Sequence, residues 1–216
     1  MDRRRAGPVP PRHRRQRLAP AYHLAAATGM RRGEILGLRW ADVDLGAKRL
    51  SVRQALIAVV YKMRFSDVKT AAGRRTIDIS PADVDVLTTW RRRQAEERLL
   101  IGPAWEDNSL VFCRPDGRPI HRERFSRTFN QLVARHWMPD IRLHDLRHTH
   151  ASLLLKAGVP IKVVSERLGH ASATFTLNTY QWLLPGMQAE AAATFQRLLA
   201  NPEPDEHDER ASNDVP

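Results

Sequence analysis

Helix-like segments that stop at a glycine set the fold class of this chain. Apolar residues recur in them at spacings of three and four, which places those residues on one face of a helix. A glycine just past the last periodic residue is a common helix end, because glycine adopts the left-handed conformation without strain. Three such segments are Ala21–Thr28 before Gly29, His144–Ala157 before Gly158 and Pro160–Leu168 before Gly169. Further helices are predicted from near Arg31 and over Pro81–Leu100, Arg122–Trp137, Thr176–Leu183 and Pro185–Leu199.

A short β-rich region interrupts this helical pattern. KRLSVRQALIAVV alternates in part and contains β-branched residues, and VKTAAGRRTIDIS places a glycine-containing turn between two strand-like runs. These features predict a small antiparallel sheet of three strands over Arg49–Ile79. The expected class is therefore mainly α with a small three-stranded antiparallel sheet (α+β).

The two ends of the chain differ in composition from the middle. Residues 1–19 combine prolines with like charges and lack periodic apolar positions, which indicates a basic disordered arm. Residues 201–216 carry six acidic residues against one arginine, which indicates an acidic disordered tail. The chain of 216 residues is long enough for one well-cored domain, which is expected over residues 20–200.

The positive net charge indicates which kind of molecule the protein binds. The chain carries +11 at neutral pH, and without the acidic tail the charge stands near +16. Arginine heavily outnumbers lysine, and its planar fork suits bidentate contact with phosphate, so nucleic acid is the favoured partner. A genome rich in arginine codons is the plainer explanation of the same bias.

Other features exclude whole classes of protein. No uncharged apolar run reaches membrane length, and no apolar segment follows the basic N-terminus as it would in a secretory signal. The single cysteine, Cys113, cannot form an internal disulfide and fits a reducing cytoplasm.

The stretch LHDLRHTHASLLL, residues 143–155, holds three histidines and an arginine. His144 and Arg147 share a helix face, and His148 lies one turn from His144. Three interpretations stand side by side. A zinc site is one, although the glutamate of HExxH and a cysteine cluster are both missing. The second is a structural amphipathic helix whose polar face is exposed to solvent. The third is half of a reaction centre that is completed by residues elsewhere in the sequence.

Three further stretches supply such partners, and the four motifs together carry a family resemblance. In chain order they are TGMRRGEILGLRW, VKT, HDLRHTHAS, and LGH followed by TLNTY. Over about Leu24–Leu184 the chain resembles the catalytic domain of the tyrosine recombinases, also called the phage integrase family. The resemblance implies a reaction centre made of Arg31, Lys69, His144, Arg147, His170 and Tyr180.

The chemistry of phosphodiester transfer explains why these residue types act together. Arg31 and Arg147 are expected to clamp the non-bridging oxygens, on which negative charge develops. The nucleophile would be Tyr180, whose unperturbed pKa near ~10 calls for a proton acceptor, and His144 is the candidate. The resemblance implies that Lys69 protonates the departing 5′-oxygen.

His170 would then donate a hydrogen bond to a phosphate oxygen. The product is a 3′-phosphotyrosine linkage, which conserves the energy of the broken bond, so no ATP is required. No carboxylate cluster suits divalent metals, and the cationic side chains would supply the charge stabilisation that metals supply in a nuclease. The expected reaction therefore uses no metal and no other cofactor.

The resemblance also implies a biological role and partners. The chain is expected to be a site-specific DNA recombinase or integrase that serves integration or excision of a mobile element. Its partner would be double-stranded DNA, on which it forms a homotetramer while the free chain is a monomer, with accessory DNA-bending proteins. The expected place is the bacterial cytoplasm, at the nucleoid. The alternatives are a catalytically silent DNA-binding remnant and an unrelated metalloprotein built on the histidines.

Two departures from the family pattern carry expectations of their own. Family members have an N-terminal core-binding domain that this sequence lacks, so we expect a truncated protein with weak site-specific affinity. Apolar surface near Ala21–Ala27 would then lack its cover. Ala173 and Phe175 replace more usual aliphatic residues, which is expected to alter the presentation of Tyr180.

Overall fold

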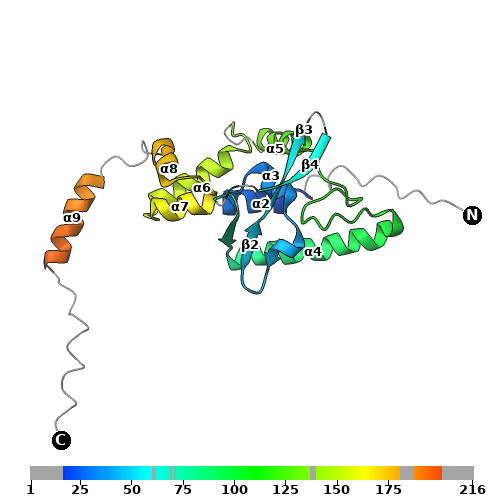
Figure 1. Cartoon of the computed structure of the whole chain (residues 1–216), viewed down its shortest axis with the longest axis horizontal. Coiled ribbons are helices and arrows are strands. Elements are labelled where there is room, and N and C mark those ends of the chain that lie inside the picture. Colours follow the sequence, from blue (N-terminus) through cyan, green and yellow to red (C-terminus); the bar gives the residue numbers. More distant parts are fainter. Residues whose placement is uncertain are drawn as a thin grey trace, which may run out of the picture. The chain divides into compact units, whose positions relative to one another are not determined.

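The computed structural model describes residues 17–59, 62–68, 70, 72–136, 140–180 and 187–200 (Figure 1). The helices are α2 (Ala19–Thr28), α3 (Arg32–Gly37), α4 (Pro81–Ile101), α5 (Arg122–Arg135), α6 (Asp145–Lys156), α7 (Ile161–Leu168), α8 (Ala173–Tyr180) and α9 (Met187–Ala200), with short 3-10 turns at Trp40–Asp42 and Gly102–Ala104. The strands are β1 (Val43–Asp44), β2 (Arg49–Val52), β3 (Gln54–Val59), β4 (Lys62–Asp67) and β5 (Arg75–Asp78). Contacts divide the chain into two units, residues 1–179 and 180–216.

Helix ends follow the local sequence signals. Ser80 begins α4: its hydroxyl accepts from the backbone N–H of Asp83, and the Asp83 carboxylate accepts from the backbone N–H of Ser80. Such a reciprocal cap satisfies two donors that a helix start otherwise leaves unpaired. Gly29 and Gly169 end α2 and α7 with φ of 64° and 68°, as the glycine stops predicted.

The β-region contains more strands than predicted. β1, β2 and β5 form a three-stranded antiparallel sheet, and β3 and β4 pair separately as an antiparallel hairpin. In the first sheet Leu50 opposes Ile77, and both side chains are buried. The prediction of a small three-stranded antiparallel sheet is confirmed, but the prediction that Arg49–Ile79 forms a single sheet was wrong, because its strands belong to two sheets. The chain changes sheets at Arg53, whose carbonyl accepts from the N–H of Val68.

The core lies where α2 packs against α4 and α6, and where α3 packs against β3 and α5 (Figure 1). Its largest fully buried side chains include Trp90, Phe112, Phe125, Leu24, Ile35 and Leu36. The expectation of uncovered apolar surface near Ala21–Ala27 was wrong, because Ala21, Leu24 and Ala25 are buried by these contacts. This packing fixes the ends of α2 and α6 next to each other, which positions the site described below.

Arg17 fastens the start of the described chain to α4. Its guanidinium is 4% exposed, ion-pairs with Glu97 at 2.5 Å and donates to the carbonyl of Cys113. It also lies 4.8 Å from the centre of the Trp90 ring. The predicted basic arm otherwise falls on residues 1–16, outside the described residues, as does the predicted acidic tail.

Among the residues that the structure describes, no helix combines the length and the apolar character needed to cross a membrane.

Candidate active site

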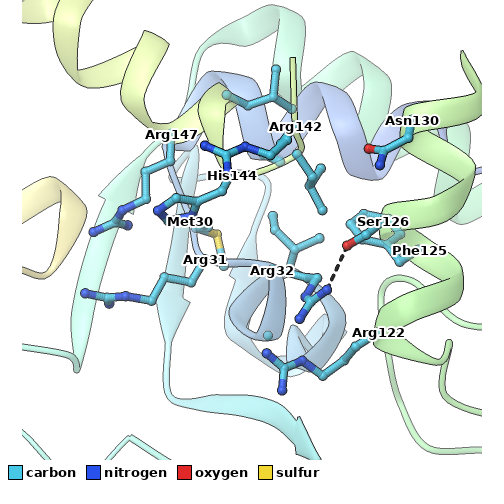
Figure 2. A pocket seen from close by; sticks show the side chains of 15 residues that line it. Met30, Arg31, Arg32, Arg122, Phe125, Ser126, Asn130, Arg142, His144 and Arg147 are labelled. Carbon is cyan, nitrogen blue, oxygen red and sulfur yellow. Dashed lines mark hydrogen bonds between the residues drawn. The ribbon is translucent and has the colours of Figure 1, made fainter. Parts of the chain in front are cut away.

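An arginine-lined pocket opens between α3, α5 and the start of α6, with a volume of about 500 Å³ (Figure 2). We call it the arginine pocket. Its charged and titratable lining residues are Arg31, Arg32, Arg122, Arg142, Arg147 and His144. None of the described residues that line it carries a carboxylate. A concave site with this charge selects an anion.

Backbone carbonyls hold Arg147 in place. This residue lies in the first turn of α6 and is 5% exposed. One terminal nitrogen donates to the carbonyl of Gly29 at 2.6 Å, and the other donates to the carbonyl of Leu168 at 2.8 Å. Both carbonyls lie at helix C-termini, where carbonyls lack intrahelical partners and the helix dipole is negative. The ends of α2 and α7 therefore orient the guanidinium from two sides.

Arg31 is held by a similar arrangement but keeps more exposure. It caps the start of α3, and its guanidinium contacts a Glu34 oxygen at 3.0 Å and the Gly169 carbonyl at 3.1 Å. Its side chain is 46% exposed. One face is therefore fixed by the protein while the rest can reach a ligand.

Glu34 links Arg31 to a second arginine, Arg75 on β5. The Arg75 guanidinium lies 2.8 Å from a Glu34 oxygen, and both side chains are almost fully buried. Burial raises the pKa of the Glu34 carboxyl, but the hydrogen bonds and charges of Arg75 and Arg31 outweigh it and hold the pKa below its usual value. Glu34 is therefore ionised at neutral pH. Arg75 also donates to the carbonyl of Arg167 at 2.7 Å, which ties β5 to α7.

His144 immediately precedes α6 and lines the same pocket as Arg31 and Arg147. Its ring meets that of His148 edge-on, with centroids 4.9 Å apart. Burial lowers the pKa of His144, and the neighbouring His148 and Arg147 lower it further. The imidazole is therefore mainly neutral at neutral pH and has a nitrogen able to accept a proton.

His170 follows Gly169, whose carbonyl contacts Arg31. Its Nδ1 lies 2.7 Å from the hydroxyl of Thr176, a fully buried residue of α8. Burial lowers the pKa of His170 to about 4, and Arg147 and Arg31 reinforce the shift. When the Thr176 hydroxyl donates to Nδ1, the ring proton is on Nε2, which can then donate to a ligand.

Thr176 and Arg75 were missed by the sequence analysis. Thr176 is the polar residue that sits at a buried position of α8, and a hydroxyl buried there needs a partner. Arg75 stands in a strand next to another arginine, and only its long-range pairing with Glu34 distinguishes it.

The remaining predicted residues are placed as follows. Lys69 lies outside the described residues. Tyr180 is the last residue of α8 and the first of the second unit, and it is 3% exposed. Within the described part of the chain, no cluster of three or more His, Cys, Asp or Glu side chains is suited to a metal ion.

The fold and the pocket together define a class: a mainly α-helical protein with a pocket, lined by arginines and by His144, whose charge suits an anion. The sequence matches the model of the Phage integrase family over residues 10–185, and the chain belongs to this family.

Two relatives agree with this assignment. The chain is 33% identical over 195 residues to a tyrosine recombinase XerC-like protein of Caldanaerobacter subterraneus, a match that covers 85% of this chain and 50% of the relative. It is 30% identical over 178 residues to the ICEBs1 integrase of Bacillus subtilis, covering 82% of this chain and 48% of that one. The chain thus spans about half the length of these relatives.

The fold is that of a tyrosine recombinase catalytic domain, as predicted. The Tn1549 transposon integrase in complex with transposon right end DNA superposes with a TM-score of 0.70 and 20% identity, over 92% of this chain and 68% of that one. The XerA recombinase superposes with a TM-score of 0.60 and 21% identity, over 89% of this chain and 66% of that one.

Proposed function

We propose that this protein is a site-specific DNA recombinase that cleaves and rejoins DNA through a 3′-phosphotyrosine intermediate. The observation that carries the proposal is the convergence of Arg31, Arg147 and His144 on one pocket, with both arginines held by backbone carbonyls. Membership in the integrase family supports it, and relatives named as integrases favour integration or excision of a mobile element as its role.

In the proposed reaction the two arginines bind the scissile phosphate. Arg31 and Arg147 donate to the non-bridging oxygens, and their charge stabilises the negative charge that grows there in the transition state. Because the protein already orients both guanidinium groups, little reorganisation is needed when the phosphate arrives. Oxygen atoms bound in this way keep the phosphorus open to attack in line with the leaving group.

Proton transfers accompany the exchange of bonds. The Tyr180 hydroxyl gives its proton to His144 and bonds to phosphorus, and the bond from phosphorus to the 5′-oxygen breaks. Lys69 gives a proton to that oxygen, while His170 donates a hydrogen bond to a phosphate oxygen. A 5′-hydroxyl from the same or a partner strand then loses its proton and attacks the phosphorus, the bond from phosphorus to the Tyr180 oxygen breaks, and that oxygen regains a proton from His144, which rejoins DNA. Tyr180 and Lys69 take these roles from the family motif alone.

The proposal extends to organisation and partners. Residues 20–200 form the catalytic domain, with residues 1–19 as a basic arm and 201–216 as an acidic tail. The partner is double-stranded DNA, on which the chain forms a homotetramer, assisted by accessory DNA-bending proteins at the nucleoid. Four protomers bring together the strands that exchange.

The test is formation of a covalent adduct with DNA. The protein is incubated with labelled, nicked duplexes that span the borders of the element, with and without excess EDTA, and run on a denaturing gel beside Tyr180→Phe. A slow, protease-sensitive band that needs Tyr180 and persists in EDTA is the expected result. An adduct that forms with Tyr180→Phe, or only with a divalent metal, contradicts the mechanism. No adduct, with salt-sensitive DNA binding retained, identifies a silent DNA-binding protein instead.

A further inference from the structure

The arginine pocket has a second side that the proposed cleavage reaction does not use. Arg32, Arg122, Ser126 and Asn130 line the pocket where it meets α5, and we call this the α5 side. Figure 2 shows these residues across the cavity from Arg31 and Arg147. A volume of about 500 Å³ lies in the range of sites for whole small-molecule ligands, so the pocket has room for more than one phosphate.

Arg32 is the first residue of α3, whereas Arg31 precedes the helix with an extended backbone, and the two side chains make different contacts. While Arg31 reaches toward α7, Arg32 donates to the Ser126 hydroxyl of α5 at 2.8 Å. Its nearest carboxylate is Glu123, at 3.5 Å and 69% exposed, which makes a weak, solvent-screened ion pair. The positive charge of Arg32 is therefore only partly compensated.

Arg122, at the start of α5, adds a second cation. Its Nε is buried and has no hydrogen-bond partner among the residues that the structure describes. Buried donors are nearly always paired, so the described part of the chain satisfies the Arg122 guanidinium only in part. Burial lowers the pKa of Arg32, and the charge of Arg122 lowers it further. The two guanidinium groups repel each other, and an anion bound between them would relieve that repulsion.

We propose that Arg32, Arg122 and Ser126 bind a second phosphate of the DNA, next to the one held by Arg31 and Arg147. Successive phosphates of one strand follow each other every ~3.4 Å along the duplex axis, so a neighbour always accompanies the scissile phosphate. The two guanidinium groups supply the charge and the Ser126 hydroxyl supplies a neutral donor. Holding two consecutive phosphates fixes the direction of the strand as well as its position. This inference rests on the proposed function.

The salt dependence of DNA affinity tests the subsite without any cleavage. A fluorescent duplex of fixed sequence is titrated by anisotropy at several NaCl concentrations with the wild type and with Arg32→Met/Arg122→Met, which keeps the apolar stems. Each phosphate contact contributes about 0.9 to the slope of log K against log salt, so the double variant should lower the slope by about 1. Arg92→Met is the matched control, because Arg92 is an exposed residue of α4 outside the pocket.

Several results separate the possible outcomes. The double variant should still unfold in one cooperative transition, because the hydrogen bond and weak ion pair of Arg32 are lost together with the repulsion between the two cations. A wild-type slope and affinity for the double variant would overturn the proposal. A second result would also overturn the proposal. If the salt slope is unchanged in the double variant, and inorganic phosphate raises the melting temperature of the wild type but not of the variant, the site binds a free anion and not a DNA phosphate. Adduct formation by the wild type is scored separately, so failure of the subsite and failure of the proposed function give different results.

Discussion

At the scale of single residues, the site depends on which nitrogen of each histidine carries a proton. His144 and His170 have lowered pKa values, so both rings are mainly neutral at neutral pH. A neutral imidazole has one donor and one acceptor, and the proposed roles need an acceptor at His144 and a donor at His170. The neighbours of each ring therefore decide its function.

Thr176 is predicted to fix the tautomer of His170. Thr176→Val keeps the shape but removes the hydroxyl that contacts Nδ1, so the ring proton is no longer held on Nε2. We expect the rate of adduct formation to fall about fivefold, the equivalent of one neutral hydrogen bond of about 1 kcal/mol. Thr176→Ser is the control and should restore the rate. Equal rates for the valine variant and the wild type would remove Thr176 from the mechanism.

His144 is predicted to cause the fall in reaction rate at acidic pH. Because its pKa lies below the usual value near ~6.5, the base form predominates at neutral pH and is lost as the pH falls through the lowered pKa. The rate of adduct formation should therefore be level near neutral pH and decline in acid. His144→Gln should be slow at every pH and lose that decline. If His144→Gln shows the same dependence of rate on pH as the wild type, another group causes the fall in acid.

Glu34 is predicted to stabilise the fold above pH 5. Its folded pKa is depressed below the unfolded value of about 4.3, so its contribution is present above that value and is lost as the pH falls through the folded pKa. Glu34→Gln leaves Arg75 buried without its counter-charge, and we expect a loss of about 3–5 kcal/mol in the free energy of unfolding at pH 7. Urea unfolding at pH 7 and pH 4 is the measurement. The gap between variant and wild type should narrow at pH 4, and a constant gap would contradict the argument.

At the scale of elements, two helix C-termini build the site. Gly29 and Gly169 end α2 and α7 in the left-handed conformation, and their carbonyls accept from Arg147 and Arg31 respectively. The end of α2 thus holds Arg147 of α6, and the end of α7 holds Arg31, which precedes α3. The same glycines that stop the helices also orient the two cations.

Gly29→Ala is predicted to damage both stability and activity. At φ 64° an alanine is strained, and its Cβ would lie 2.7 Å from a Leu168 methyl and 2.8 Å from the His150 ring. Gly158→Ala is the matched control, because Gly158 also has a positive φ of 79° but nothing within 4 Å of the added Cβ. The control should lose about 1–2 kcal/mol in thermal unfolding. Gly29→Ala should lose more and form adducts slowly, and equal effects would mean that the close contact is unimportant.

The sequence predicted elements better than it predicted their partners. Helix ends were foreseeable because a glycine after an apolar period is a local signal, as at Gly169. The change of sheet at Arg53 was not, since strand pairing is decided by contacts distant in the chain. For the site, the motif identified Arg31 and Arg147, but nothing local shows that the carbonyls of Gly29 and Gly169 hold them. Arg75 escaped notice because its partner Glu34 lies 41 residues away.

At the scale of the whole molecule, assembly on DNA is predicted to change the mass of the particle. Four basic chains repel one another in solution, and DNA phosphates supply the charge that lets them come together. Light scattering should give one chain's mass without DNA and four chains with duplexes that carry the target site. A tetramer without DNA would show that protein contacts suffice. A single chain on saturating target DNA would exclude the proposed tetramer.

The hydrogen bonds that hold Arg147 and Arg31 join segments that are far apart in the chain, so the pocket can form only after both segments have been synthesised. Arg147 meets a carbonyl 118 residues back in the chain, and Arg31 meets one 138 residues ahead. Contacts of such long range need both segments of the chain to be present and close large loops at an entropic cost. A chain still emerging from the ribosome therefore carries basic surface long before it has both arginines aligned. If the proposed function holds, attraction to DNA precedes the alignment of the two arginines, and the proposed strand cleavage waits until nearly the whole domain has been synthesised.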